Sequence, residues 1–171
     1  TQSFEGAGGA GAAIRAFGGP ARGEVYAVGV DRRLLRHDGQ RWIAMAVPPP
    51  AGQRENLTGV ACLDGGVYIS SALGSDEGRL LHGGADGFVE VARCRMPLVG
   101  MAALGERLLF VTGDGVATYE GDDIRMIKSF PTNAIYPGIG RVFVLQPAPE
   151  RPMFAEYEPR HPQAPWWRLV Y

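Results

Sequence analysis

Cysteine, lysine and long apolar runs are almost absent from this chain of 171 residues. Its two cysteines, Cys62 and Cys94, lie 32 residues apart with no CxxC spacing, so neither a disulfide framework nor a zinc site is indicated. We expect both to be small buried hydrophobic residues. No apolar run approaches the ~18–20 residues that a membrane helix needs, so we expect no membrane contact.

An excess of positive charge is also missing. Seventeen Lys and Arg residues stand against 18 Asp and Glu, and the net charge is −1. A surface that binds the phosphates of nucleic acid normally requires a basic excess, so nucleic acid is not an expected partner. Lys128 is the only lysine, and this use of arginine in place of lysine indicates a GC-rich, bacterial genome. The length fits a single domain.

Glycine and proline, in contrast, are abundant and spread along the whole chain, with 25 and 13 copies. Frequent turn residues between short apolar runs are typical of many short strands. The one helical candidate, residues 10–17, is cut by Gly18, Gly19 and Pro20. These features predict an all-β fold, preceded by a Gly-rich N-terminal arm at residues 1–13.

Internal repetition is the most informative pattern. A short apolar segment occurs four times, at residues 23–28, 65–70, 106–111 and 140–145. Its fourth position is Tyr26, Tyr68, Leu109 and Phe143, at intervals of 42, 41 and 34 residues. Each copy has the composition of a buried strand next to a turn.

Three further strands complete each repeat. A strand of small residues precedes the segment, and two strands follow it, separated by an Asp/Gly turn. The last strand opens with a large apolar residue in every copy: Trp42, Phe88, Ile124 and Trp167. Four antiparallel strands in about 40 residues form the blade of a β-propeller. We therefore predict an all-β propeller of four four-stranded blades, at approximately residues 14–50, 51–97, 98–132 and 133–171.

The blades must pack against one another, because a single blade cannot bury both of its faces. Four of them fit either a self-closed ring, which we favour, or half of a larger ring completed by another copy. The small residues of the first strands suit a crowded ring axis: Gly59, Ala61, Gly100, Ala102 and Ala103.

The repeats of residues 14–171 also resemble kelch-type blades, and the first repeat carries the resemblance most clearly. The first repeat contains a Val-Tyr-Ala-Val-Gly strand, a His-Asp turn at residues 37–38, then Trp42 and Pro48. In kelch blades a strand that ends in two glycines precedes a turn, a Trp and a closing Pro. Here one glycine, Gly29, stands where that pattern has two. The resemblance implies architecture rather than function, since propellers serve as scaffolds, lectins and enzymes.

Two patterns in the sequence could indicate cofactor binding or catalysis. Residues 6–11 match G-x-G-x-x-G, and Asp31 follows twenty residues later, as in a dinucleotide-binding fingerprint. No buried strand precedes this motif, so we interpret it as a flexible arm. His37 and His82 occupy equivalent repeat positions that also hold tyrosines, which favours a structural role, and His161 has no identifiable partner.

Charged residues gather in the loops that should open on one face of the propeller. Aspartate in such turns commonly accepts backbone hydrogen bonds, but a rim of mixed charge also suits protein recognition. The candidate partner-binding residues are Asp31, Arg32, Arg33, Arg54, Asp76, Glu77, Arg95, Asp114, Glu150 and Arg151. Trp166 and Tyr171 in the aromatic last strand are candidates for assembly, which leaves a homodimer open.

No grouping typical of a nucleophilic enzyme occurs in the sequence. The sequence therefore predicts a non-catalytic β-propeller that binds a protein partner as an inhibitor, immunity or scaffold protein, without a cofactor or a metal. Two alternatives remain: a carbohydrate-binding lectin with pockets between blades, and a nucleotide-dependent enzyme that uses Gly6–Gly11.

Overall fold

The computed structural model describes residues 13–21, 23–50, 52, 54–146, 153–158 and 166–170, with the backbone alone at 21, 153 and 166–170. These residues form sixteen strands and one short 3₁₀ turn, η1 (Val30–Arg32). The first two sheets contain β1 (Ile14–Ala21), β2 (Glu24–Gly29), β3 (Leu34–His37), β4 (Trp42–Met45), β5 (Glu55–Leu63), β6 (Gly66–Leu73), β7 (Glu77–Gly84) and β8 (Gly87–Cys94). The last two contain β9 (Gly100–Leu104), β10 (Arg107–Val111), β11 (Gly115–Glu120), β12 (Asp123–Ser129), β13 (Ala134–Gly138), β14 (Arg141–Gln146), β15 (Met153–Glu158) and β16 (Trp166–Val170).

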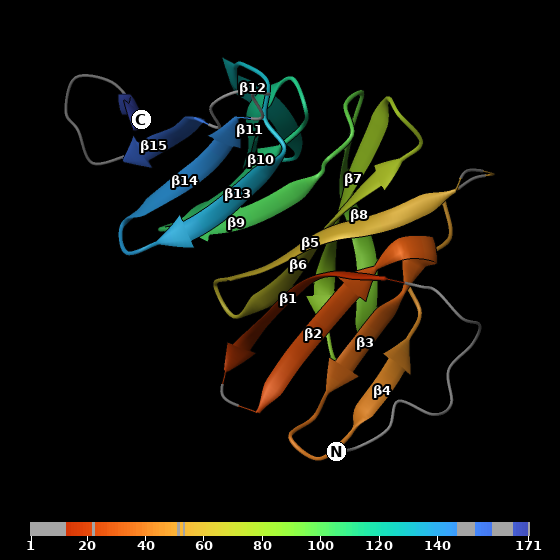
Figure 1. The fold of residues 1–171 in the computed structure, drawn as a ribbon. Helices are drawn as coiled ribbons and strands as arrows, with labels where there is room; N and C mark the ends of the chain where they lie inside the picture. The colour runs from red at the N-terminus through yellow and green to blue at the C-terminus, as the bar shows by residue number, and fades with distance from the viewer. Residues whose placement is uncertain are drawn as a thin grey trace.

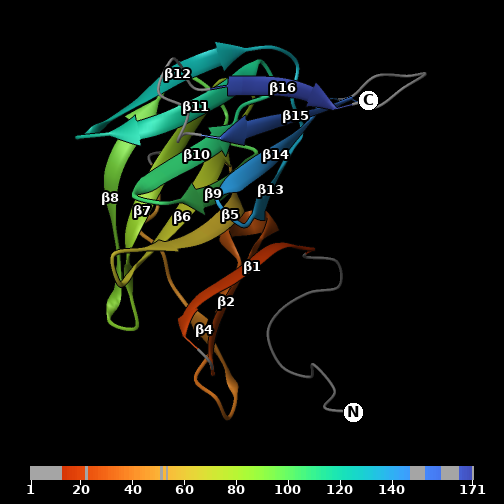
Figure 2. The same cartoon turned by 90° about the vertical axis from the view of Figure 1, so that its left-hand side faces the viewer.

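Each sheet is a meander of four consecutive antiparallel strands, in the order β1-β2-β3-β4 and so on through β13-β14-β15-β16. The sheets follow one another around a common axis as the blades of a propeller (Figures 1 and 2). The predicted all-β propeller of four four-stranded blades is thus confirmed. We call the sheets the first to the fourth blade in chain order.

The repeated column of large residues lies in the second strand of every blade. Tyr26, Tyr68, Leu109 and Phe143 belong to β2, β6, β10 and β14, as the repeat predicts. Because side chains alternate along a strand, each second strand sends one set of residues toward the preceding blade and the other set toward the next. The hydrophobic core therefore lies between the blades, where the side chains of facing strands meet.

Three hydrophobic clusters fill the spaces between consecutive blades. The first joins Tyr26 and Val28 to Val67 and Ile69 across the contact between the first and second blades. A second cluster, which contains Phe110, joins the second blade to the third, and a third one joins the third blade to the fourth. Extensive contacts link the described strands of consecutive blades, whereas the first and fourth blades stand apart (Figure 1).

Close approach between the second and third blades requires glycine. A Cβ atom built on Gly59 in β5 would lie 2.8 Å from the backbone nitrogen of Met101 in β9. On Gly78 in β7 it would lie 2.7 Å from the carbonyl oxygen of Met96 and 2.9 Å from the nitrogen of Leu98. All three of these neighbours are backbone atoms, which cannot rotate away as a side chain can.

We predict that Gly78→Ala lowers the free energy of unfolding by about 1–3 kcal/mol, because the added methyl group overpacks this contact. Gly84→Ala in the same strand is the matched control, since no atom lies within 4 Å of a Cβ added there. Urea unfolding of the two variants measures the difference. A Gly78→Ala variant as stable as Gly84→Ala would contradict the close approach.

Candidate binding site

An open hollow of about 400 Å³ lies between the second and third blades. The beginning of β7 and the end of β8 form one side of it, and the beginning of β12 forms the other. Its lining combines charged and apolar side chains: Glu77, Arg93, Cys94, Arg95, Met96, Asp123 and Ile124. Such a mixture suits recognition of a polypeptide segment, in which apolar contact and charge pairing act together.

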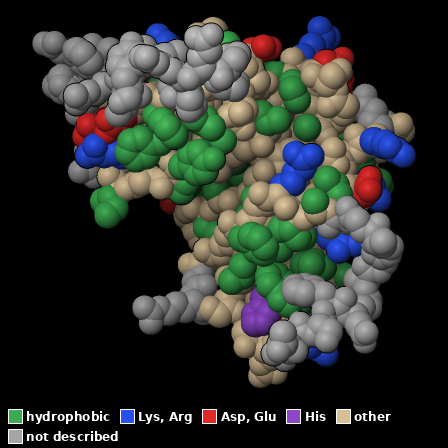
Figure 3. Space-filling view, in the orientation of Figure 1, with side chains coloured by type: hydrophobic (Ala, Val, Ile, Leu, Met, Phe, Trp, Pro, Cys, Tyr) green, Lys and Arg blue, Asp and Glu red, His purple; other side chains and the backbone are tan. Residues whose placement is uncertain are grey.

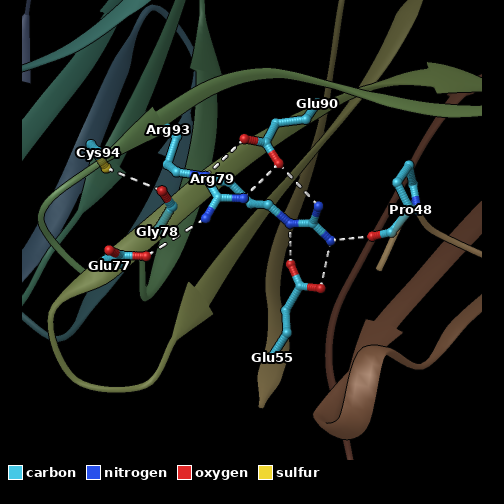
Figure 4. Close-up of polar contacts among 8 residues, drawn as sticks. All are labelled: Pro48, Glu55, Glu77, Gly78, Arg79, Glu90, Arg93 and Cys94. Atoms are coloured by element: carbon cyan, nitrogen blue, oxygen red, sulfur yellow. Dashed lines mark hydrogen bonds and ion pairs between the residues drawn. The ribbon is translucent and has the colours of Figure 1, made fainter. Parts of the chain in front are cut away.

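A chain of alternating charges leads from the interior of the second blade to the rim of this hollow (Figure 4). Arg79 pairs with Glu55 and Glu90. Glu90 pairs in turn with Arg93, whose guanidinium lies 3.6 Å from the carboxylate of Glu77. Arg93 is therefore held by carboxylates on two sides, and this fixes the charged edge of the hollow.

The inner end of this chain is fully buried. The side chains of Arg79 and Glu55 are 1% and 0% exposed, and their two hydrogen bonds are both 2.6 Å long. Arg79 also donates to the carbonyl oxygen of Pro48 at 2.5 Å and to Glu90 at 3.1 Å. Pro48 lies in the connection between the first and second blades, so one guanidinium ties that connection to β5, β7 and β8.

The charges of this network reinforce one another. A hydrogen bond from Arg93, aided by one from Arg79, lowers the pKa of Glu90 below its usual value. A hydrogen bond from Glu90 raises the pKa of Arg93. Burial disfavours the charged form of Arg79, but its bonds to Glu55 and Glu90 outweigh that cost and raise its pKa. The shifted pKa values of Glu90, Arg79 and Arg93 thus favour the charged forms of these three side chains at neutral pH.

Arg95 differs from Arg79 and Arg93, which are both ion-paired. It is exposed beside the hollow and forms no ion pair with another described residue. Met96 and the buried Ile124 provide apolar surface in the same hollow. An unpaired guanidinium next to apolar surface fits a carboxylate that is followed by an apolar side chain.

Cys94 does not supply a nucleophile to the hollow. Its thiol is buried and donates to the carbonyl oxygens of Met96 at 3.3 Å and Gly78 at 3.7 Å. Burial raises the pKa of the thiol, so it stays protonated near neutral pH. Of the two predicted buried cysteines, Cys94 is buried and Cys62 is partly exposed.

The structure brings only two of the predicted contact residues together, since Glu77 and Arg95 both line the hollow. Asp31 and Arg32 lie in η1 with positive φ angles, and the backbone N–H of Asp31 donates to Asn56 at the start of β5. The others with described positions lie in separate connections between strands: Arg33, Arg54, Asp76 and Asp114.

The remaining predicted residues lie outside the described part of the chain. These are Glu150, Arg151, Tyr171, His161 and the Gly6–Gly11 motif, together with the side chain of Trp166. The two described histidines pack on aromatic rings of their own blades. His37 meets Trp42 edge to face at 5.1 Å, and His82 stacks on Tyr68 at 4.4 Å.

Sequence reasoning missed the apolar Met96 and five charged residues of the site, which are Arg79, Glu55, Glu90, Arg93 and Asp123. One signal could have indicated Arg79. Arg79 stands directly before Leu80 and Leu81 in an apolar strand, where an arginine needs a buried partner. Its partner Glu55 lies 24 residues away, and no local spacing connects the two.

Within the described residues, no group of three or more His, Cys, Asp and Glu side chains is arranged to hold a metal ion. The same part of the chain contains no helix with the length and apolar character needed to cross a membrane.

Comparison with solved structures finds the same fold in longer proteins. YCF48 bound to a D1 peptide matches with a TM-score of 0.69 and 13% identity, over 92% of this chain and 53% of that one. YCF48 from Cyanidioschyzon merolae gives 0.67 and 12%, over 92% and 56%. A protein of unknown function from Bacteroides caccae gives 0.61 and 12%, over 95% and 62%.

This chain therefore spans between half and two thirds of the length of these structures. At such identities the likeness shows a β-propeller fold and nothing finer. No protein-family model matches the sequence, and no curated protein matches it.

We predict that Arg79→Met destabilises the protein by about 3–5 kcal/mol, because it leaves the carboxylate of Glu55 buried without a partner. The double variant Arg79→Met/Glu55→Met should recover most of this loss, since no uncompensated charge remains. Arg36→Met is the control, because its pair with Glu24 is partly exposed and is worth about 0–1 kcal/mol. Equal losses in Arg79→Met and Arg36→Met, measured by chemical unfolding, would contradict this role.

The lowered pKa of Glu90 predicts an acid-sensitive contribution to stability. A carboxylate with a lowered folded pKa stabilises the fold above its unfolded pKa and loses that contribution as the pH falls through its folded pKa. Unfolding measured from about pH 7 to about pH 3 should therefore show a weaker pH dependence in Arg93→Gln. Arg125→Gln, which breaks an exposed pair with Asp123, serves as the control. If the stability of Arg93→Gln depended on pH as strongly as that of the wild type, the coupling between Arg93 and Glu90 would be refuted.

Proposed function

We propose that this chain is a non-catalytic β-propeller module that binds a segment of a partner protein in the hollow between the second and third blades. The observation that carries the proposal is Arg95, an exposed cation without a described ion-pair partner beside apolar Met96 and Ile124. The partner segment is extended, with an acidic residue next to an apolar one.

Two further observations support this function. The charged edge of the hollow is rigid, because Arg93 is fixed by Glu90 and Glu77, and a preformed edge reduces the entropy lost on binding. YCF48, which has a similar fold, is a propeller whose structure has been solved with a bound peptide. The kelch-type resemblance of the first repeat and the role of an inhibitor, immunity or scaffold protein belong to the same proposal.

Selection of peptides from a random displayed library on the immobilised protein tests this function. We predict enrichment of peptides that place Asp or Glu beside an apolar residue. Arg95→Glu should weaken their binding at least about tenfold, because attraction becomes repulsion at the same position. Arg107→Glu is the matched control, since Arg107 is exposed at the start of β10 and does not line the hollow. Fluorescence polarisation of the selected peptides gives the dissociation constants.

Two results would reject the proposed site. One is the absence of any selected peptide, and the other is an equal loss of binding in Arg95→Glu and Arg107→Glu. Thermal stabilisation by sugars would favour the lectin alternative instead, and stabilisation by NAD(P) would favour the nucleotide-dependent enzyme.

A further inference from the structure

The second blade extends beyond the third blade at one end. Its strands contain eight or nine residues, whereas the strands of the third blade contain five to seven. In Figure 2 the turn between β7 and β8 projects below the third blade at the lower left. Part of the sheet face that the second blade turns toward the third blade is therefore left uncovered.

A row of three side chains crosses this uncovered part. Tyr68 pairs with His82, and His82 pairs with Val89, so the three stand on one face of the sheet. Tyr68 packs against the hydrophobic cluster between the second and third blades, which places the row on the face toward the third blade. Even so, Val89 is 61% exposed, and Tyr68 and His82 are partly exposed. The equivalent column residues Tyr26 and Leu109 are both 0% exposed.

Glycines lie between this row and the turn that joins β7 to β8. Gly84 and Gly87 pair with each other, two positions beyond His82 and Val89 on the same face. A Cβ atom built on either glycine would have no atom within 4 Å, so the space above their backbone is open. The absence of side chains there permits the backbone of a bound segment to approach closely.

The third blade adds a second tyrosine to this region. Tyr119 in β11 is partly exposed and packs against the same cluster as Tyr68. Burial raises the pKa of Tyr119, and the nearby Tyr68 and Asp122 raise it further. His82 stacks on Tyr68 with ring centroids 4.4 Å apart. We call Tyr68, His82, Val89 and Tyr119 together the aromatic surface.

Carboxylates flank the aromatic surface. Because neighbouring strands are antiparallel, the turns after the first and third strands of a blade lie at the same end of it. Arg107 and Arg125 are the bases in and beside these turns of the second and third blades, and Arg125 is paired with Asp123. Five exposed carboxylates there form no ion pair with another described residue: Asp64, Asp86, Glu106, Glu120 and Asp122.

This combination indicates the charge of a ligand. Figure 2 shows the four turns on its left side, and Figure 3 views the molecule from the opposite side, where Lys and Arg side chains are scattered among acidic and apolar ones. Aromatic rings bordered by unpaired carboxylates complement a positively charged, partly apolar ligand. Arginine is the best match, because a guanidinium both stacks on aromatic rings and pairs with carboxylates.

We propose that the aromatic surface binds an arginine-bearing, partly apolar segment of a partner protein. Arginine side chains of the segment lie over Tyr68 and Tyr119 and pair with the carboxylates of the turns, while its apolar side chains cover Val89. None of these residues lines the hollow that we propose for an acidic segment. This inference therefore does not depend on the proposed peptide site.

A labelled peptide in which Arg and Leu alternate is the probe, and fluorescence polarisation measures its dissociation constant. We expect Asp86→Lys and Asp122→Lys each to weaken binding at least about threefold, because attraction at the border becomes repulsion. Asp76→Lys is the matched control, since Asp76 is exposed between β6 and β7, at the other end of the second blade, and should leave the affinity unchanged. All three positions are exposed, and circular dichroism checks that the variants fold.

Two further variants separate the contributions. Tyr119→Leu keeps an apolar side chain but removes the ring, and it should weaken binding of the probe about two- to fivefold. Arg95→Gln should leave binding of the probe unchanged, because Arg95 belongs to the hollow. The probe can therefore bind even where no acidic peptide does, so each proposal succeeds or fails separately.

Several outcomes would overturn the proposal. One is equal binding of the probe and of a counterpart with Glu in place of Arg. Equal losses in Asp76→Lys and Asp86→Lys would show attraction by overall charge alone, and a loss in Arg95→Gln would assign the probe to the hollow. A wild-type chain that is dimeric by light scattering, and monomeric as Asp86→Lys, would show that a second copy occupies the aromatic surface instead.

Discussion

Each blade of this protein is apolar on both faces and therefore needs a neighbour on either side. This constraint organises the structure. The second strands β2, β6 and β10 each direct one column of side chains toward the next blade, and β6, β10 and β14 each direct another column toward the preceding blade. Buried columns of aliphatic and aromatic residues provide most of the stabilisation, at about 25 cal/mol for each Å² of apolar surface removed from water. Glycines at the closest approaches allow the backbones to meet.

Much of this architecture could be predicted from the sequence, because the sequence contains one repeat for each blade. The position of Tyr26 recurs at Tyr68, Leu109 and Phe143, and every copy lies in a second strand. The turns were also visible, since Gly23, Gly65, Gly105 and Gly140 precede these strands with the positive φ angles that tight turns require. Periodicity shows which residues face a neighbouring blade but does not show whether a neighbour is present.

The candidate site could be predicted only in part, for a physical reason. Loop charges such as Glu77 and Arg95 are visible in the sequence, and both border the hollow. The hollow itself depends on how β8 approaches β12, and this approach is set by the packing of two blades. The ion pair of Arg79 and Glu55 could not be predicted from the sequence either, because it forms across the sheet between β5 and β7. Contacts between strands that are far apart in the chain produce no local residue spacing from which they could be predicted.

Amide hydrogen exchange tests the central claim most directly. If coverage on both faces determines local stability, the amides of β6 and β10 should exchange most slowly. Those of β2 and β14 should exchange faster, because each of their blades packs on only one other blade among the described residues. Equal protection of β10 and β14, or slowest exchange in β14, would contradict this account of the fold.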